Sequence, residues 1–269
     1  MKHLKKGKYF VDDKWVNNLD HLVVTEAKCK NTSIDWHYHQ NSYFSYSLEG
    51  HCIEKSKRKT YAVKPGTLLF HNWQDAHCNT NHSEYSRNFY VELEKEWFVD
   101  RNINQSKIEG SMQIENPFLK YLYHQIYLET RLKDDSFNIS VESLLCNVFE
   151  LLNDSTKVNN SVTPIWVNKV KEIIHDQFLD KLTLEYLSKE ANVHPSHLSR
   201  EFPRYFKSTL GNYIRKVKIE HSITLLKVRD SLTNVAYECG FADQSHFIRC
   251  FKASYNMTPN TFKKILASR

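Results

Sequence analysis

The chain has 269 residues, of which 41% are hydrophobic and 25% charged, a composition typical of a globular protein with one or two domains. No apolar run approaches the roughly 18 residues of a membrane-spanning helix, and the basic N-terminal residues lack the apolar stretch of a secretory signal. The net charge of +6 arises from residues 164–269, which hold 17 basic and 10 acidic residues, whereas residues 1–163 hold 20 and 21. We therefore expect a cytoplasmic protein without a membrane partner, whose basic C-terminal segment binds a polyanion.

Cysteine usage points to the same compartment. The six cysteines are scattered and include no Cys-x-x-Cys pair, so we expect reduced, mostly buried thiols rather than disulfides or a zinc site. They are Cys29, Cys52, Cys78, Cys146, Cys239 and Cys250.

Between residues 22 and 93 the chain alternates short runs of β-branched and aromatic residues with turn signals such as Glu49-Gly50 and Lys64-Pro65-Gly66. Evenly spaced strands of this kind are typical of a sandwich or barrel. The predicted strands include residues 23–25, 43–48, 67–70 and 87–91.

From Asn116 the hydrophobic period becomes helical. Asn116-Pro117 is a typical helix start, and helices are predicted near residues 117–132 and 139–152. Their apolar faces could pack against the barrel or join two copies of the chain. The polar run after residue 152 predicts a linker. The predicted organisation is a first domain at 1–153, a linker at 154–163 and a helical domain at 164–269.

The helical domain contains a repeat. Ser-His-Leu-Ser-Arg-Glu-Phe runs from Ser196 to Phe202, and Ser-His-Phe-Ile-Arg-Cys-Phe runs from Ser245 to Phe251. Each copy follows a short helical pattern that ends in Asn192 or Gly240, the residue types that most easily adopt a left-handed conformation. Helix, sharp turn and helix form the helix-turn-helix layout.

Within each repeated helix the apolar residues lie four apart and face inward, while short polar side chains and one arginine share the exposed side. Such a face suits base edges and phosphates in a major groove, although any single exposed side chain could simply be solvated. Residues 212–229 predict a helix about 27 Å long that joins the two units, so the reading helices could reach major grooves about 34 Å apart.

Residues 165–266 resemble the DNA-binding domain of the AraC/XylS family of bacterial transcription regulators. The most diagnostic part is the run VAYECGFADQSHF at residues 235–247, followed by Phe251-Lys252 and Met257-Thr258-Pro259. The resemblance implies sequence-specific binding to double-stranded DNA, recruitment of RNA polymerase and a homodimer. It places base-reading positions on Ser196, Ser199, Arg200, Gln244, Ser245, His246 and Arg249.

Two positions depart from the family pattern. Pro203 stands where a lysine is common, and because an interior proline costs a helix roughly 3 kcal/mol, we expect it to shorten or bend the first reading helix. The family's usual glycine is replaced by Lys207, and its counterpart in the second repeat is Asn256.

Residues 20–95 resemble, more loosely, the cupin-like sensor domain of such regulators, through Trp36-His37-Tyr38-His39, Gly50, Pro65-Gly66 and His77. Metal-binding cupins add a glutamate where this chain has Tyr43 or Phe44. His37, His39 and His77 could still form a three-nitrogen site, because strand alternation places both residues of His-x-His on one face. With the oxygen ligand missing, we expect no metal and no other cofactor.

Aromatic residues in the same region could line a pocket for a small-molecule effector, or they could simply fill the core of the barrel. They are Trp36, Tyr38, Tyr46, Phe70, Trp73 and Tyr90.

The predicted fold is α+β multidomain, with an N-terminal cupin-like β-barrel and dimerisation helices, and a C-terminal all-α domain of two helix-turn-helix units joined by a linker helix. We expect an effector-controlled transcriptional regulator, an activator by family tendency. Two alternatives stay open, namely an effector-independent DNA-binding dimer and a metal-dependent cupin enzyme fused to a DNA-binding domain. We expect no enzymatic activity, since no nucleophile–base pair, phosphate loop or G-x-S-x-G motif is present.

Overall fold

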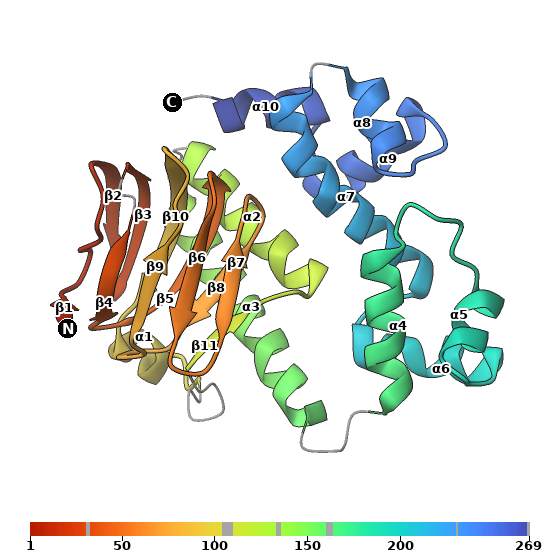
Figure 1. The fold of residues 1–269 in the computed structure, drawn as a ribbon, viewed down its shortest axis with the longest axis horizontal. Helices are drawn as coiled ribbons and strands as arrows, with labels where there is room; N and C mark the ends of the chain where they lie inside the picture. Colours follow the sequence, from red (N-terminus) through yellow and green to blue (C-terminus); the bar gives the residue numbers. More distant parts are fainter. Residues whose placement is uncertain (31–32, 104–109, 133–135, 160–163, 230, 268–269) are drawn as a thin grey trace. The chain divides into compact units, whose positions relative to one another are not determined.

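The computed structural model describes residues 1–30, 33–103, 110–132, 136–159, 164–229 and 231–267. The chain divides into two compact units, Met1–Glu115 and Asn116–Arg269. The first contains the strands and the second is built from helices (Figure 1). The predicted fold class, a sheet-rich N-terminal part followed by a helical C-terminal part, is therefore confirmed. No helix within the described ranges is both long and apolar enough to cross a membrane.

The N-terminal unit consists of two sheets, in which β1 and β4 pair in parallel and the other neighbours pair antiparallel. The five-stranded sheet has the order β1 (Lys2–Leu4), β4 (Ile34–His39), β9 (His77–Thr80), β6 (Cys52–Ser56) and β7 (Thr60–Val63). The six-stranded sheet has the order β11 (Ser111–Gln113), β8 (Leu68–His71), β5 (Ser42–Glu49), β10 (Ser86–Leu93), β3 (Leu22–Cys29) and β2 (Asp13–Leu19).

Aromatic residues from central strands of the six-stranded sheet are fully buried, notably Phe44 on β5, Phe70 on β8 and Phe89 on β10. Each strand pairs on both sides, so β-branched and aromatic side chains are favoured there. A short helix, α1 (Lys95–Asp100), follows β10 and buries Trp97 and Phe98.

The second unit contains nine helices within the described residues. They are α2 (Pro117–Leu132), α3 (Phe137–Asn159), α4 (Ile165–Asp176), α5 (Leu184–Glu190), α6 (Pro195–Phe206), α7 (Leu210–Val228), α8 (Leu232–Glu238), α9 (Gln244–Tyr255) and α10 (Pro259–Ala267).

The segment predicted as a linker at 154–163 begins as helix, because α3 continues to Asn159. The run from Asn153 to Asn159 contains neither glycine nor proline, so an established helix can propagate through it. Residues 160–163 of the predicted linker lie outside the described ranges. The boundary between the two compact units lies after Glu115, because α2 packs on α3 and α7 and so belongs to the second unit. The boundary at residue 153 stays a prediction.

The apolar faces of α2 and α3, offered above as a contact between two copies, are mostly buried within the chain. Tyr123, Ile126, Leu145 and Phe149 are each 0% exposed, whereas Ile139 is 72% exposed. Ordinary packing therefore accounts for most of these residues. None of the six cysteines, all of which lie in the described ranges, forms a disulfide, and Cys146 of α3 is the exposed one among them.

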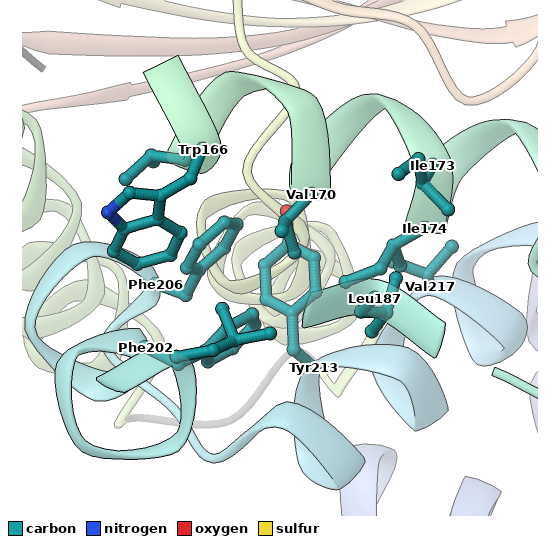
Figure 2. Packing of buried hydrophobic residues seen from close by; sticks show 11 residues of the cluster. Trp166, Val170, Ile173, Ile174, Leu187, Phe202, Phe206, Tyr213 and Val217 are labelled. Carbon is teal, nitrogen blue, oxygen red and sulfur yellow. The ribbon is translucent and has the colours of Figure 1, made fainter. Parts of the chain in front are cut away.

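The first helix-turn-helix unit packs around a single apolar cluster, shown in Figure 2. Trp166 and Val170 of α4 meet Phe202 and Phe206 of α6, and Tyr213 of α7 lies among them. The rings of Phe202 and Phe206 stack at 4.0 Å. Because α6 buries its aromatic face here, its opposite face is left to solvent.

Candidate functional site

The first repeated helix, α6, begins at a capped end. His194 is the N-cap residue, its Nδ1 accepts from the backbone N–H of Ser196 at 3.3 Å, and Pro195 follows at the first helical position. Leu198 is fully buried, while Ser196 and Ser199 are exposed. The Ser196 hydroxyl lies 2.7 Å from His194 Nδ1, so one predicted base-reading group also belongs to the cap.

The second repeated helix, α9, has the same construction with a different cap. The Asp243 carboxylate accepts from the backbone N–H of His246 at 2.7 Å. Phe247 and Phe251 are fully buried, and Ser245 is exposed on the opposite side.

Two further predicted base-reading residues of α9, Gln244 and His246, are half-buried. Gln244 Oε1 accepts from the hydroxyl of Thr233 at 2.9 Å, so the donor that the side chain can offer to another group is its Nε2. The structure thus places Gln244, Ser245 and His246 together in the first turn of α9, where a recognition helix contacts base edges.

The two equivalent arginines differ in their surroundings. Arg200 has a side chain 73% exposed, and its Nε donates to Glu201 Oε1 at 3.2 Å. Arg204, one turn further along α6, lies 3.6 Å from the same carboxylate and was not among the predicted residues, although its i+4 spacing from Arg200 could have revealed it. Among the described residues no hydrogen-bond partner is found for the exposed Arg249 side chain.

Of the two effects expected of Pro203, a shorter or a bent reading helix, the shortening is not found, and the bend stays a prediction. Both α6 and α9 have 12 residues, and Pro203 lies on the exposed side of α6. Both helices end in a left-handed residue, Lys207 with φ of 53° and Asn256 with φ of 53°. The position normally taken by glycine therefore keeps its backbone conformation in both repeats, at a cost that is greater for lysine than for asparagine.

Helix α7 joins the two units. Its 19 residues correspond to a length of about 29 Å. Tyr213 and Val217 belong to the first core, and Leu226 near the other end of α7 is fully buried. The same helix packs against α8, α9 and α10 of the second unit. One rigid helix therefore contributes to both cores and sets the spacing between the two reading helices.

In the barrel, strand β4 has a register shift against β9 between Ile34 and His37. After this bulge, alternation along the strand buries His37 and His39 and turns Trp36 and Tyr38 outward. Trp36 is 42% exposed. Because His37 and His39 point inward, the residues that alternate with them, Trp36 and Tyr38, cannot line the interior as well. The predicted histidine group and the predicted aromatic pocket therefore exclude each other at these positions.

A cavity of about 60 Å³ opens between the two sheets and has a lining of mixed polar and apolar character. Of the six aromatic residues expected around an effector pocket, Tyr90 lines it. Tyr46 and Phe70 are buried elsewhere, and Trp73 is 54% exposed. The cavity is far smaller than the ~300 Å³ of typical ligand pockets, but it holds several times the ~15 Å³ that a water molecule needs.

The three histidines predicted as candidate metal ligands do come together. His37, His39 and His77 are buried, and one ring nitrogen of each lies within 4.8 Å of the others. His37 Nδ1 donates to the carbonyl of Asp35 at 2.8 Å, so its Nε2 carries the lone pair. Burial lowers the pKa of His37 to about 4 and also lowers the pKa of His39 and His77, so all three are neutral at pH 7.

Sequence reasoning missed Glu54 of β6 and His71 of β8, which form a second such group with His77. Burial raises the pKa of Glu54 to about 8 and lowers that of His71 well below its ordinary value. Neither residue belongs to the His-x-His motif. Strand pairing brings them in, and no local pattern in the sequence could have revealed it.

Comparisons with known proteins identify a helix-turn-helix domain within the helical unit. A family model described as a helix-turn-helix domain matches residues 187–265, which include α6 and α9. YdeC of Bacillus subtilis (strain 168), an uncharacterised HTH-type transcriptional regulator, is 25% identical over 261 residues, covering 87% of this chain and 88% of YdeC. The HTH-type transcriptional activator RhaS of Mannheimia succiniciproducens is 25% identical over 272 residues, covering 92% of this chain and 96% of RhaS.

Among solved structures, an apo variant of ToxT from Vibrio cholerae aligns with a TM-score of 0.41 and 13% identity, over 93% of this chain and 99% of ToxT. The sequence relatives that span nearly the whole chain are transcriptional regulators, and the matched domain contains both repeated helices. The chain is therefore a DNA-binding transcriptional regulator of the helix-turn-helix type, in agreement with its resemblance to the AraC family.

Proposed function

We propose that the chain is a transcriptional activator that reads two successive major grooves of double-stranded DNA through α6 and α9. The observation that carries this proposal is the duplication of one exposed face. Arg200 and Arg249 occupy equivalent positions on helices of equal length, and buried aromatic residues lie behind each. The name of the relative RhaS supports activation, which implies contact with RNA polymerase.

The two faces would divide their contacts by chemistry. The guanidinium of Arg249 suits the two acceptors on a guanine edge, and the Gln244 amide suits adenine. Ser196, Ser199 and Ser245 are short donors that can reach either bases or phosphates. His246 is half-buried beside Phe241, at a ring separation of 5.5 Å, which supports a positioning contact at the start of α9.

The N-terminal part would hold the signal. The cavity between the sheets is the proposed effector site, and its volume of about 60 Å³ favours an ion or a very small molecule. Such a ligand changes DNA binding only if it binds two arrangements of the protein with different affinity. In this scheme residues 1–153 sense the signal, 154–163 connect, and 164–269 bind DNA.

A homodimer remains part of the proposal, with the exposed side of α3 as its contact. Ile139 is 72% exposed there, and Cys146 lies two turns further along the same side. Two copies would place four reading helices on paired half-sites.

Hydroxyl-radical footprinting on DNA from upstream of the protein's own gene tests the two-groove reading. We expect two protected segments about 10 base pairs apart on one face of the DNA. Arg200→Ala should weaken one segment and Arg249→Ala the other, whereas Lys189→Ala, on an exposed position of α5, should weaken neither. A single segment that responds to both arginine variants would contradict the proposal.

A further inference from the structure

The barrel contains a second group of buried ligand atoms beside the His-x-His pair. We propose that Glu54, His71 and His77 bind a divalent transition-metal ion. One ligand atom of each lies within 4.8 Å of the others, and all three residues are at most 5% exposed. They come from β6, β8 and β9, so the group draws on both sheets.

Two of these ligand atoms lack a hydrogen-bond partner among the described residues. Glu54 Oε1 and His71 Nε2 are buried, and they face each other at 3.6 Å. Leaving two buried polar atoms unsatisfied is costly. Two ligands that each lie about 2.1 Å from a tetrahedral ion are about 3.4 Å apart, close to the separation found here.

The hydrogen bonds around the group fix both imidazoles in the tautomer that a metal needs. Ser111 Oγ donates to the Asp75 carboxylate, so it accepts from His71 Nδ1 at 3.0 Å. His77 Nδ1 donates to the Asp75 carbonyl at 3.1 Å. Asp75 thus orients both rings, and each Nε2 carries a lone pair. Such outer partners are typical of metal-binding histidines.

Glu54 differs from a purely structural buried carboxylate in the same barrel. Its Oε2 accepts from Asn79 at 3.1 Å, which leaves Oε1 unpaired. Glu92, also buried, has both oxygens satisfied by the backbone of Gly7 at 2.8 Å and by the side chain of Asn41 at 2.9 Å. The unpaired oxygen is therefore a property of Glu54 itself, and Glu92 provides a matched control.

Tyr43 would compete with a metal ion for the Nε2 atom of His77. Its ring stacks on His71, the residue opposite it on β8, and its hydroxyl lies 3.0 Å from His77 Nε2. Burial raises the pKa of Tyr43 well above its ordinary value, so the hydroxyl keeps its proton and donates it to that lone pair. A metal ion at His77 must displace this hydrogen bond. Metal-binding cupins have a glutamate near the position of Tyr43. In this chain the carboxylate of the proposed site is supplied by Glu54, on another strand.

Two imidazole nitrogens and one carboxylate oxygen suit Zn²⁺ and its first-row neighbours better than Ca²⁺ or Mg²⁺, which prefer oxygen ligands. The metal site stands on these contacts alone. Its further role, as the signal that changes DNA binding, rests on the proposed function.

The test is titration of the metal-stripped full-length protein with Co²⁺, followed by absorption, and with Zn²⁺, followed by calorimetry. We expect one ion per chain and visible bands of a Co²⁺ ion with nitrogen and oxygen ligands. Glu54→Gln should weaken Zn²⁺ binding at least about a hundredfold, because loss of outer partners alone costs 10- to 100-fold. Tyr43→Phe should strengthen it about fivefold, since a competing hydrogen bond is removed.

Glu92→Gln and His37→Gln should leave the affinity for Zn²⁺ within about threefold, and circular dichroism verifies that each variant folds. The proposal is overturned if the wild-type protein binds neither ion, or if His37→Gln abolishes binding while Glu54→Gln retains it. An unchanged affinity in Tyr43→Phe would also contradict it, even if Glu54→Gln fails to fold. Equal DNA affinity with and without metal would refute only the signalling role and leave the metal site standing.

Discussion

Arg200 of α6 donates from its Nε to Oε1 of Glu201 at 3.2 Å, while the equivalent Arg249 of α9 is followed by Cys250, which offers no carboxylate. The hydrogen bond to Arg200 lowers the pKa of Glu201, so the carboxylate is charged at neutral pH. The two reading faces therefore approach DNA with different net charge, although their shapes repeat.

Glu201→Gln should strengthen DNA binding. The substitution removes a negative charge beside Arg200 and Arg204 and frees both guanidinium groups for phosphates or bases. We expect a two- to fivefold gain at ~0.15 M salt, shared by specific and random DNA. Fluorescence anisotropy at several salt concentrations measures it. Glu185→Gln, on the exposed side of α5, is the control, and an equal gain there would show a general charge effect.

Arg249→Ala should cost roughly 1–3 kcal/mol on the specific site and relax the preference at one base pair. Arg200→Ala should cost less, because Glu201 already neutralises part of its charge. Competition assays with single-base operator variants measure both. A larger loss for Arg200→Ala would reverse this ranking, and an equal loss of Arg249→Ala on random DNA would mean that Arg249 contacts phosphate alone.

Gly240→Ala should destabilise the second helix-turn-helix unit by about 1–2 kcal/mol. Gly240 has φ of +70°, and an added Cβ would lie 3.2 Å from the backbone oxygen of Leu179. Urea unfolding followed by circular dichroism measures the loss. Asn192→Gly, at the equivalent turn with φ of 53°, should change stability by less than about 0.5 kcal/mol, since asparagine tolerates this conformation. Equal effects at the two turns would contradict the argument.

Acidification should destabilise the helical unit through His124 of α2. Burial lowers the pKa of His124 to about 3, and Lys227 and Lys120 contribute to the lowering. In the unfolded chain the pKa is near 6.5, so the unfolded state takes up the proton first as the pH falls. The stability conferred by neutral His124 is therefore present above pH 6.5 and is lost progressively toward pH 3, by about 2 kcal/mol at pH 5.

Urea unfolding at pH 7 and pH 5 checks this contribution. The loss between the two values should be smaller by about 2 kcal/mol in His124→Gln than in the wild-type protein. The histidines of the barrel contribute equally to the pH-dependent loss of stability in both proteins. The difference between the two losses therefore measures the contribution of His124 alone. The same loss in both would show that His124 does not titrate in this way.

The sequence alone predicted the features that depend on local pattern. The two turns adopt positive φ at Asn192 and Gly240, as their residue types indicated. The inward pairs of the repeated helices, such as Leu198 and Phe202, are buried because their spacing matches the helical period. His37 and His39 are both buried because a strand alternates.

What the sequence could not predict depends on contacts between distant segments. Strand pairing brings Glu54 and His71 to His77, and nothing near either residue indicates it. Pro203 is accommodated within α6 because it lies on the solvent side, which the proline rule alone does not reveal. The polar segment after Asn153 continues as helix because α3 is already established before it.

The proposed function requires that this chain reads a specific DNA sequence. Fluorescence anisotropy of the purified protein on DNA from upstream of its own gene, against a scrambled duplex at ~0.15 M salt, tests it most directly. We expect a preference of at least about a hundredfold for the native sequence. Equal, weak binding to both duplexes, with and without added Zn²⁺, would contradict it.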